Sequence, residues 1–196
     1  EGQFDVYLQP QYSLITDGIV GAEARVRWIH PEKGVIPPGA FVPIFERNGF
    51  IRKLDAFVWE RTCRLIRSWM DRGQILPVSV NISRIDLYDQ TLSQKLHALV
   101  KRYGIPISLL KLEITESAYA ENPRQVIGAV EQLQSKGFIV EMDDFGSGYS
   151  SLNILKDVPV NALKLDLRFL SGQDPTGRGG SIINSVIRMA KWLRLP

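Results

Sequence analysis

Apolar residues follow two alternating patterns along the chain: short apolar runs, and longer stretches in which apolar positions recur every three or four residues. The short runs are typical of β-strands, and the longer stretches are typical of amphipathic helices. The predicted strands cover residues 21–28, 77–82, 110–114, 138–142 and 161–165. The predicted helices cover residues 55–71, 91–103, 122–137, 151–157 and 181–193. This alternation predicts βαβ units and a mostly parallel α/β sheet, either open or closed into a barrel.

Capping residues support several of the helix boundaries. Asp55 is the predicted N-cap of the first helix, and Gly73 lies just past the end of that helix. Asn122 followed by Pro123 is typical of a helix start, because proline is tolerated at the first helical position.

Size and composition indicate one globular domain. The chain has 196 residues, of which 44% are hydrophobic and 23% are charged, as in soluble domains with a sizeable core. No apolar stretch approaches the roughly 18 residues of a membrane span. A lone Cys63 favours a reducing compartment, because it has no partner for an internal disulfide. The net charge of +3 allows an anionic ligand, and we expect no nucleic-acid partner.

Most predicted strands carry a polar residue at or near their carboxyl end, where burial is costly. The carboxyl ends of parallel strands meet at one mouth of a barrel or one edge of a sheet, where α/β proteins bind ligands. The residues expected there are Glu23, Asn81, Glu113, Asp143, Asp144 and Lys164. Converging carboxylates repel one another unless they are protonated or neutralised by cations. Oxygen ligands without a Cys/His cluster favour Mg²⁺ or Mn²⁺ over zinc.

The adjacent pair Asp143-Asp144 suits a site for two metal ions. One carboxylate could bridge both ions while the other holds the second, and two metals about 3.5–4 Å apart commonly serve attack on a phosphodiester. Lys164 could then orient or deprotonate the attacking water, or offset phosphate charge. Ordinary roles also exist for Asp144 as a helix N-cap, for Lys164 as a surface residue and for Glu116 as a loop hydrogen-bond acceptor. The metal hypothesis depends on joint placement.

Several motifs resemble those of the EAL family of bacterial signalling domains, in order and at matching spacing. The segment Gly21-Ala-Glu-Ala-Arg-Val-Arg-Trp28 resembles the signature that names the family. The later motifs are Asn81-Ile-Ser83, Glu113-Ile-Thr-Glu116, Asp143-Asp-Phe-Gly-Ser-Gly-Tyr-Ser-Ser-Leu152 and Lys164-Leu-Asp166. Tyr7-Leu-Gln9-Pro10 resembles the family's opening strand. The resemblance covers the whole chain, and the run that begins at Asp143 is highly specific.

The resemblance implies a TIM-like (β/α)₈ barrel with one antiparallel strand. It also implies an enzyme that hydrolyses one phosphodiester of the bacterial second messenger cyclic di-GMP, giving linear pGpG, with two ions of Mg²⁺ or Mn²⁺. The metal ligands that it implies are Glu23, Asn81, Glu113, Asp143 and Asp144, with Asp143 shared between the ions. The catalytic residues that it implies are Lys164, which acts on the water, and Glu116, which orders the loop of residues 145–152. The substrate-binding residues are Gln9, Arg27 and Asp166.

Two features depart from the family's pattern. The third signature residue is Arg25 instead of Leu, on the same strand face as Glu23, so its cation is expected to point toward the metal mouth. In an active full-length protein, Arg25→Leu is expected to change substrate affinity more than metal affinity, because the first signature residue, and not the third, is the implied metal ligand. The second departure is the end of the chain at Pro196, about two strands short of an eight-stranded barrel. We expect residues 1–196 to be an EAL domain truncated before the seventh strand, with no appreciable activity alone.

Two alternatives to a phosphodiesterase stay open. A degenerate EAL domain would bind cyclic di-GMP or a protein partner without catalysis; Arg25 favours this reading, and the intact ligand motifs favour the enzyme. A glycosidase would use a pair of the acids, but Asn81 and the adjacent aspartates fit metal binding better.

The resemblance also implies a cellular setting. A homodimer is expected through the loop after Asp144 and the apolar stretch of residues 182–193. Fusion to a sensory or GGDEF domain is expected in the full-length protein. The location is expected to be the bacterial cytoplasm, including the cytoplasmic part of a membrane-anchored protein.

Overall fold

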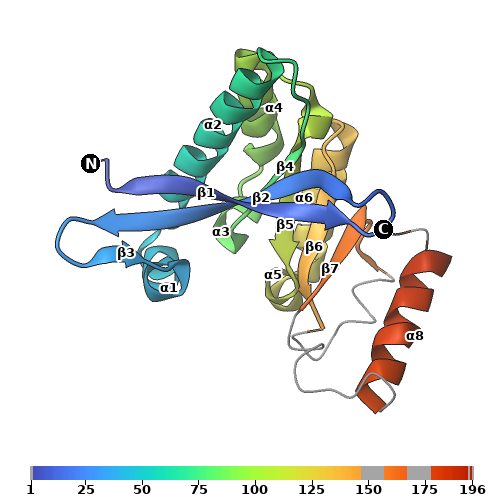
Figure 1. Cartoon of the computed structure of the whole chain (residues 1–196). Coiled ribbons are helices and arrows are strands. Elements are labelled where there is room, and N and C mark those ends of the chain that lie inside the picture. Colours follow the sequence, from blue (N-terminus) through green and yellow to red (C-terminus); the bar gives the residue numbers. More distant parts are fainter. Residues whose placement is uncertain (1, 147–156, 167–177, 194, 196) are drawn as a thin grey trace.

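The computed structural model describes residues 2–146, 157–166, 178–193 and 195. It is built around one mixed sheet with helices packed against it (Figure 1). The strands are β1 (Phe4–Ser13), β2 (Gly18–His30), β3 (Gly34–Ile36), β4 (Val78–Asn81), β5 (Leu110–Thr115), β6 (Val140–Phe145) and β7 (Ala162–Leu165). The helices are α1 (Pro38–Asn48), α2 (Ile51–Met70), α3 (Arg84–Leu87), α4 (Leu92–Tyr103), α5 (Glu116–Glu121), α6 (Pro123–Ser135) and α8 (Arg178–Trp192), with a 3₁₀ turn η1 at Ile107–Leu109.

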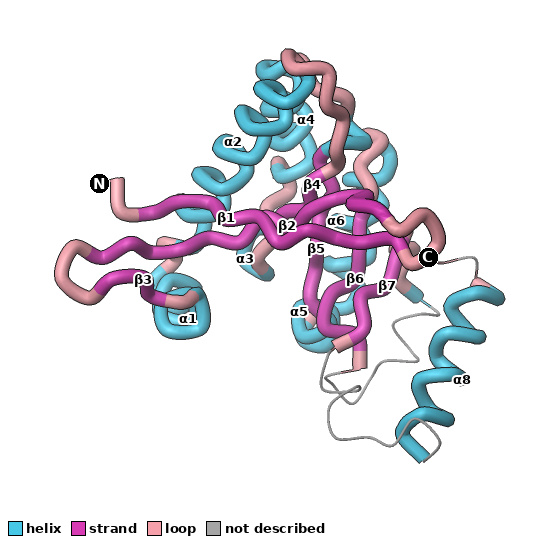
Figure 2. The backbone as a smooth tube through the Cα atoms, in the orientation of Figure 1, coloured by secondary structure: helices cyan, strands magenta, loops and turns pink. Residues whose placement is uncertain are grey.

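The sheet has the order β1-β2-β4-β5-β6-β7, with β3 also paired to β2. From β2 to β7 in this order the pairs are parallel, whereas β1 and β3 run antiparallel to β2. Figure 2 shows β1 and β2 as a long ribbon that extends beyond the parallel strands, with β3 and α1 near one end. The parallel register brings the carboxyl ends of β4 to β7 to one side, as the sequence pattern predicts.

The predicted elements correspond to observed ones wherever the structure describes them, with boundaries that differ by a few residues and the largest shift at the start of α2. The predicted helix of residues 151–157 lies outside the described residues except for its last residue. Helix α2 begins at Ile51, so Asp55 is inside the helix and the prediction that it is the N-cap is wrong. Ile51 and Leu54 extend the apolar stripe of α2 by one turn and pack against Phe41 of α1. That contact outweighs the capping preference of Asp55.

The main core lies between the sheet and helices α2, α4 and α6. Alternate residues of the central strands point into it, and Val80, Leu112 and Met142 are fully buried there. Cys63 of α2 is buried in the same core, and this burial raises the pKa of its thiol to about 12, as suits a packing role. The other alternate positions, such as Glu113, carry polar side chains. The pleat therefore separates an apolar face toward the helices from a polar face on the opposite side.

Strand β2 passes very close to the backbone that precedes β4. A Cβ atom at Gly21 would lie 3.3 Å from the carbonyl oxygen of Pro77, a backbone atom that has little freedom to move away. The next residue, Ala22, donates its N–H to that same carbonyl at 3.1 Å. Glycine at position 21 permits this contact, which fixes the position of Glu23 along β2 relative to β4.

Two buried acids join α2 to α3 directly after β4. The backbone N–H of Ser83 donates to Asp55 Oδ2 at 3.2 Å, and the Ser83 hydroxyl donates to Asp86 Oδ2 at 2.9 Å. Burial, together with the neighbouring Asp86 carboxyl, holds the pKa of Asp55 well above its usual range. Asp55 therefore holds its proton to a higher pH than an ordinary aspartate does, and in the protonated form it can donate a hydrogen bond to Asp86.

No helix in the described ranges combines the length and the apolar character that crossing a membrane requires.

We expect Asp55→Asn to preserve the free energy of unfolding at about pH 4 and to raise it near neutral pH. Asp55→Ala should lower it at about pH 4 by about 1–3 kcal/mol, since alanine leaves buried partners unsatisfied. The asparagine amide can donate to Asp86 and accept from Ser83, as the protonated carboxyl does. A raised folded-state pKa means that stability from Asp55 is present below the ordinary value of 3.8 and is lost as pH rises above it. The Asp55→Asn protein should lack this loss.

Urea unfolding of the unaltered protein and both variants at about pH 4 and about pH 7 measures these effects. Parallel pH profiles for the unaltered and Asp55→Asn proteins would show that folding does not raise the pKa of Asp55, contrary to this expectation.

Candidate metal centre

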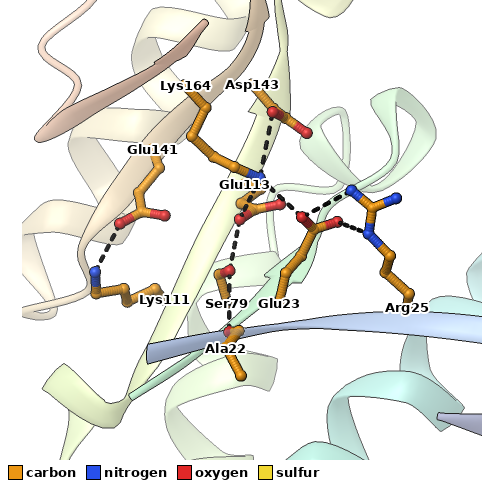
Figure 3. A network of polar contacts seen from close by, with 9 residues as sticks. All are labelled: Ala22, Glu23, Arg25, Ser79, Lys111, Glu113, Glu141, Asp143 and Lys164. Atoms are coloured by element: carbon orange, nitrogen blue, oxygen red, sulfur yellow. Dashed lines mark hydrogen bonds and ion pairs between the residues drawn. The ribbon is translucent and has the colours of Figure 1, made fainter. Parts of the chain in front are cut away.

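Three carboxylates from separate strands meet on the polar face of the sheet. They belong to Glu23 of β2, Glu113 of β5 and Asp143 of β6, and their nearest oxygens all lie within 4.8 Å of one another. Glu23 and Glu113 are buried, and Asp143 is partly buried. Figure 3 shows the three side chains pointing toward a common centre. The structure therefore brings together three of the predicted metal ligands.

The side chain of Lys164 on β7 occupies this common centre (Figure 3). Its Nζ lies 2.8 Å from Glu113 Oε1, 3.1 Å from Glu23 Oε2 and 3.3 Å from Asp143 Oδ1. Burial by itself would lower the pKa of Lys164, but the surrounding carboxylates raise it above its ordinary value. A protein cation thus lies at the point where the three acids converge, and it reduces their mutual repulsion.

Glu113 is the most deeply buried of the three acids, with no exposed surface. Its Oε1 accepts a hydrogen bond from the Ser79 hydroxyl at 2.5 Å, in addition to the contact with Lys164. Its Oε2 is buried and has no hydrogen-bond partner within the described part of the chain. Burial raises the pKa of Glu113 to about 7, Glu23 adds to this shift, and Lys164 opposes it.

These observations fit a hard divalent cation. The orphaned oxygen of Glu113 is a ready ligand, and the neighbouring carboxylates supply further oxygen ligands of the kind that Mg²⁺ and Mn²⁺ prefer. The ammonium of Lys164 shows that the centre accommodates positive charge.

Arg25 forms a second cationic contact with Glu23, on the side away from Lys164 in Figure 3. The Nε of Arg25 lies 3.0 Å from Glu23 Oε1, and its Nη2 donates to Glu23 Oε2 at 3.1 Å. Arg25 shares a strand face with Glu23 and is predicted to point toward the metal mouth, and its contact with Glu23 confirms this orientation. Because Glu23, the partner of Arg25, is itself a predicted metal ligand, we expect a substitution at Arg25 to affect metal affinity more directly than substrate affinity.

The two remaining predicted metal ligands lie differently. Asn81 at the end of β4 is the register partner of Glu113, so its side chain leaves the sheet on the same face. Its carbonyl accepts from Trp59 Nε1 at 3.1 Å, which fixes the end of the strand. Asp144 is exposed, outside the three-carboxylate group, and has a left-handed φ of 54°. Its assignment to a second metal ion stays a prediction.

The predicted substrate-binding residues lie on β1, on β2 and just past the end of β7, and they differ in burial. Gln9 of β1 is exposed and is the register partner of Glu23, so it lies beside the acids. The guanidinium of Arg27 lies 5.8 Å from the ring centroid of Tyr7 and donates to the carbonyl of Val26. Asp166 is buried just past the end of β7. Contact of Gln9, Arg27 and Asp166 with a substrate stays a prediction.

Glu116, the other predicted catalytic residue, is buried in the first turn of α5. Its Oε2 accepts a hydrogen bond from the backbone N–H of Gly146 at 2.8 Å. Glu116 thus holds the backbone just after β6, at the start of the loop that it is predicted to order. The rest of that loop, residues 147–152, lies outside the described residues.

Sequence reasoning missed polar residues deeper on the same face. Ser79 supports Glu113, and Lys111 Nζ lies 2.8 Å from Glu141 Oε1 in an ion pair (Figure 3). The signal was present in the sequence, because each of these residues interrupts an apolar strand at the alternate position that precedes a site residue. A lone polar residue inside an otherwise buried strand indicates a polar inner face.

The fold and this centre together define an α/β protein with an acidic, cation-holding site on the polar face of a parallel sheet. A family model described as EAL domain matches residues 1–196, and the chain belongs to the EAL domain family. Cyclic di-GMP phosphodiesterase NbdA of Pseudomonas aeruginosa is 35% identical over 196 residues, which are 100% of this chain and 25% of NbdA. Cyclic di-GMP phosphodiesterase RocR of the same organism is 32% identical over 192 residues, 98% of this chain and 49% of RocR.

Solved EAL structures confirm the predicted TIM-like α/β fold class. The PaMucR phosphodiesterase in complex with c-di-GMP aligns with a TM-score of 0.90 at 31% identity, covering 98% of this chain and 78% of that chain. The EAL enzyme Bd1971 with cAMP and cyclic-di-GMP bound also aligns with a TM-score of 0.90, at 26% identity, covering 99% of this chain and 54% of that chain. The chain thus spans half or less of the two curated relatives named above, and most of the PaMucR chain.

We expect the affinity for Mn²⁺ to fall as pH drops below about 7, because Glu113 must lose its proton before it can bind a cation. Displacement of one proton predicts a loss of about tenfold per pH unit. Glu113→Gln should weaken Mn²⁺ binding and flatten this dependence. Calorimetric titration between about pH 5.5 and about pH 8 measures both; an affinity that is constant over this range would contradict the assignment.

Proposed function

We propose that the protein that contains this chain hydrolyses one phosphodiester bond of cyclic di-GMP, giving linear pGpG, with two divalent cations at the acidic centre. The observation that carries the proposal is the convergence of Glu23, Glu113 and Asp143 around Lys164. Relatives that are named cyclic di-GMP phosphodiesterases, and the PaMucR phosphodiesterase in its c-di-GMP complex, support the substrate.

Bound Mg²⁺ or Mn²⁺ would supply Lewis acidity toward the phosphate and lower the pKa of a bound water. Glu23, Glu113 and Asp143 would hold the cation, and Asn81 is placed by its register to join them. Asp144 would serve a second ion, with Asp143 shared between the two ions. These carboxylates attract positive charge and leave the anionic phosphate to be held by other groups.

Lys164 is the group best placed to handle the attacking water or the phosphate. It is charged and already within hydrogen-bond reach of the acids, so a small movement would let it donate to an oxygen of the substrate or of the water. Arg27 offers a planar guanidinium that suits a phosphate, while Gln9 and Asp166 offer hydrogen bonds. Glu116 keeps the segment after β6 in place through Gly146.

A binding module without catalysis is the second candidate, and the contact of Arg25 favours it. A guanidinium on both oxygens of Glu23 occupies a ligand that the metal needs. In such a module, cyclic di-GMP would bind to the polar face and remain intact.

The wider setting completes the proposal. A homodimer and an attached sensory or GGDEF domain in the bacterial cytoplasm suit a signalling enzyme. MucR of Pseudomonas aeruginosa, 31% identical over 194 residues, is named a bifunctional diguanylate cyclase/cyclic di-GMP phosphodiesterase, which supports the domain fusion.

We expect Asp143→Asn and Lys164→Met to lower kcat/KM for cyclic di-GMP by about 10²–10⁴-fold, since each removes a group from the reacting centre. Asp143→Asn should also weaken Mn²⁺ binding, whereas Lys164→Met should leave it equal or tighter because a competing cation is lost. Formation of pGpG by the intact protein with Mn²⁺ is the measurement. Lys95→Met is the matched control, since Lys95 is an exposed lysine paired with Asp89 on the surface.

The two candidate functions separate in the same assay. If the unaltered protein binds cyclic di-GMP but forms no pGpG, the proposal of an enzyme is wrong and the binding module is the better interpretation. If Lys164→Met hydrolyses cyclic di-GMP at the rate of the unaltered protein, Lys164 does not act on the attacking water or on the phosphate.

A further inference from the structure

The two buried glutamates of the centre differ in how their oxygens are satisfied. Both oxygens of Glu23 contact protein cations: Arg25 Nε lies 3.0 Å from Oε1, while Arg25 Nη2 and Lys164 Nζ each lie 3.1 Å from Oε2. Glu113 Oε2, by contrast, has no hydrogen-bond partner in the described ranges. Glu23 is therefore the acid whose ligand atoms are already occupied.

The contact between Arg25 and Glu23 has the form of a fork. Two nitrogens of one planar guanidinium bind the two oxygens of one carboxylate, which is the arrangement that gives an arginine–carboxylate pair its directional strength. The two residues are next-but-one neighbours on β2, so the pleat places them on the same face without further adjustment.

Burial of the carboxylate distinguishes this pair from an ordinary surface ion pair. Exposed ion pairs contribute little, because both ions stay hydrated when they separate. Here the side chain of Glu23 is only 8% exposed, while that of Arg25 is 43% exposed. Among the described residues, loss of Arg25 would leave a nearly buried carboxylate with Lys164 as its one cationic partner, which it shares with Glu113 and Asp143.

We propose that Arg25 is a positioning residue that holds Glu23 in a bidentate ion pair, which a divalent cation must break in order to bind. The inference rests on the proposed metal centre and adds a control on how readily the centre fills. Within the described ranges, the three acids share the cations of Lys164 and Arg25, so an incoming metal ion competes with both. A leucine at position 25 could not form an ion pair with Glu23, so the centre would bind a divalent cation at a lower metal concentration.

Mn²⁺ titration of the intact protein by calorimetry, without substrate, tests this competition. Arg25→Leu should bind Mn²⁺ about five- to tenfold more tightly than the unaltered protein. Arg25→Lys should fall between the two, because lysine keeps the charge and loses the fork. Arg64→Leu is the matched control, since it removes the same charge from a surface arginine paired with Glu60, and it should bind Mn²⁺ like the unaltered protein.

Thermal unfolding gives a second readout that does not depend on activity. Without metal, Arg25→Leu should lower the melting temperature by about 2–4 °C, because Glu23 loses a counter-ion. With saturating Mn²⁺, the same variant should gain more stabilisation than the unaltered protein does. A variant that is destabilised equally with and without metal would show a merely structural role and overturn the proposal.

The outcomes separate this inference from the metal centre itself. If the unaltered protein binds Mn²⁺ and Asp143→Asn does not, the centre stands; equal affinities for Arg25→Leu and the unaltered protein would then overturn the role of Arg25 alone. Binding of Mn²⁺ by Arg25→Leu but not by the unaltered protein would support the strongest form of the competition. Absence of binding in both would overturn the centre and the inference together.

Discussion

The structure depends on one balance of charge, in which the ammonium of Lys164 lies among the carboxylates of Glu23, Glu113 and Asp143. The three acids on β2, β5 and β6 would push these strands apart if nothing neutralised them. The lysine on β7 instead draws β2, β5 and β6 toward a shared centre. The apolar face of the same strands packs against α2, α4 and α6, so the hydrophobic core and the ionic centre are two sides of one sheet.

This balance also explains why a single set of residues is compatible with both an enzyme and a binding module. A centre with resident cations is stable before any metal ion arrives, because Lys164 and Arg25 already compensate part of the negative charge. Metal binding is then an exchange of one cation for another, and its strength depends on how tightly the resident ones are held. A single substitution at position 25 can thus change the affinity of the centre for a metal ion.

Much of the fold and centre could be predicted from the sequence, because strand alternation encodes both. The apolar members of Leu-Lys-Leu-Glu-Ile face the helices, and the polar members face the centre, which places Glu113 correctly. Local pattern failed where tertiary contacts decide. The start of α2 moved to Ile51 because of packing against Phe41, and Asp144 adopts a left-handed backbone where the β6–β7 register shifts, so alternation alone does not place its carboxylate. The fork between Arg25 and Glu23 depends on side-chain geometry, which no periodicity specifies.

The residues of the centre are far apart in the chain, and this has a consequence for how the protein folds. Lys164 and Glu23, in contact at 3.1 Å, are separated by 141 positions. Closing a loop of that length has an entropic cost that must be met before the contact stabilises anything, so pairings of this kind are slow to form. The centre can therefore exist only after β2, β4, β5, β6 and β7 have aligned in register. A folding intermediate that has formed only the local helices and hairpins would therefore not bind a cation at this centre. Binding of the cation would show that the sheet is complete.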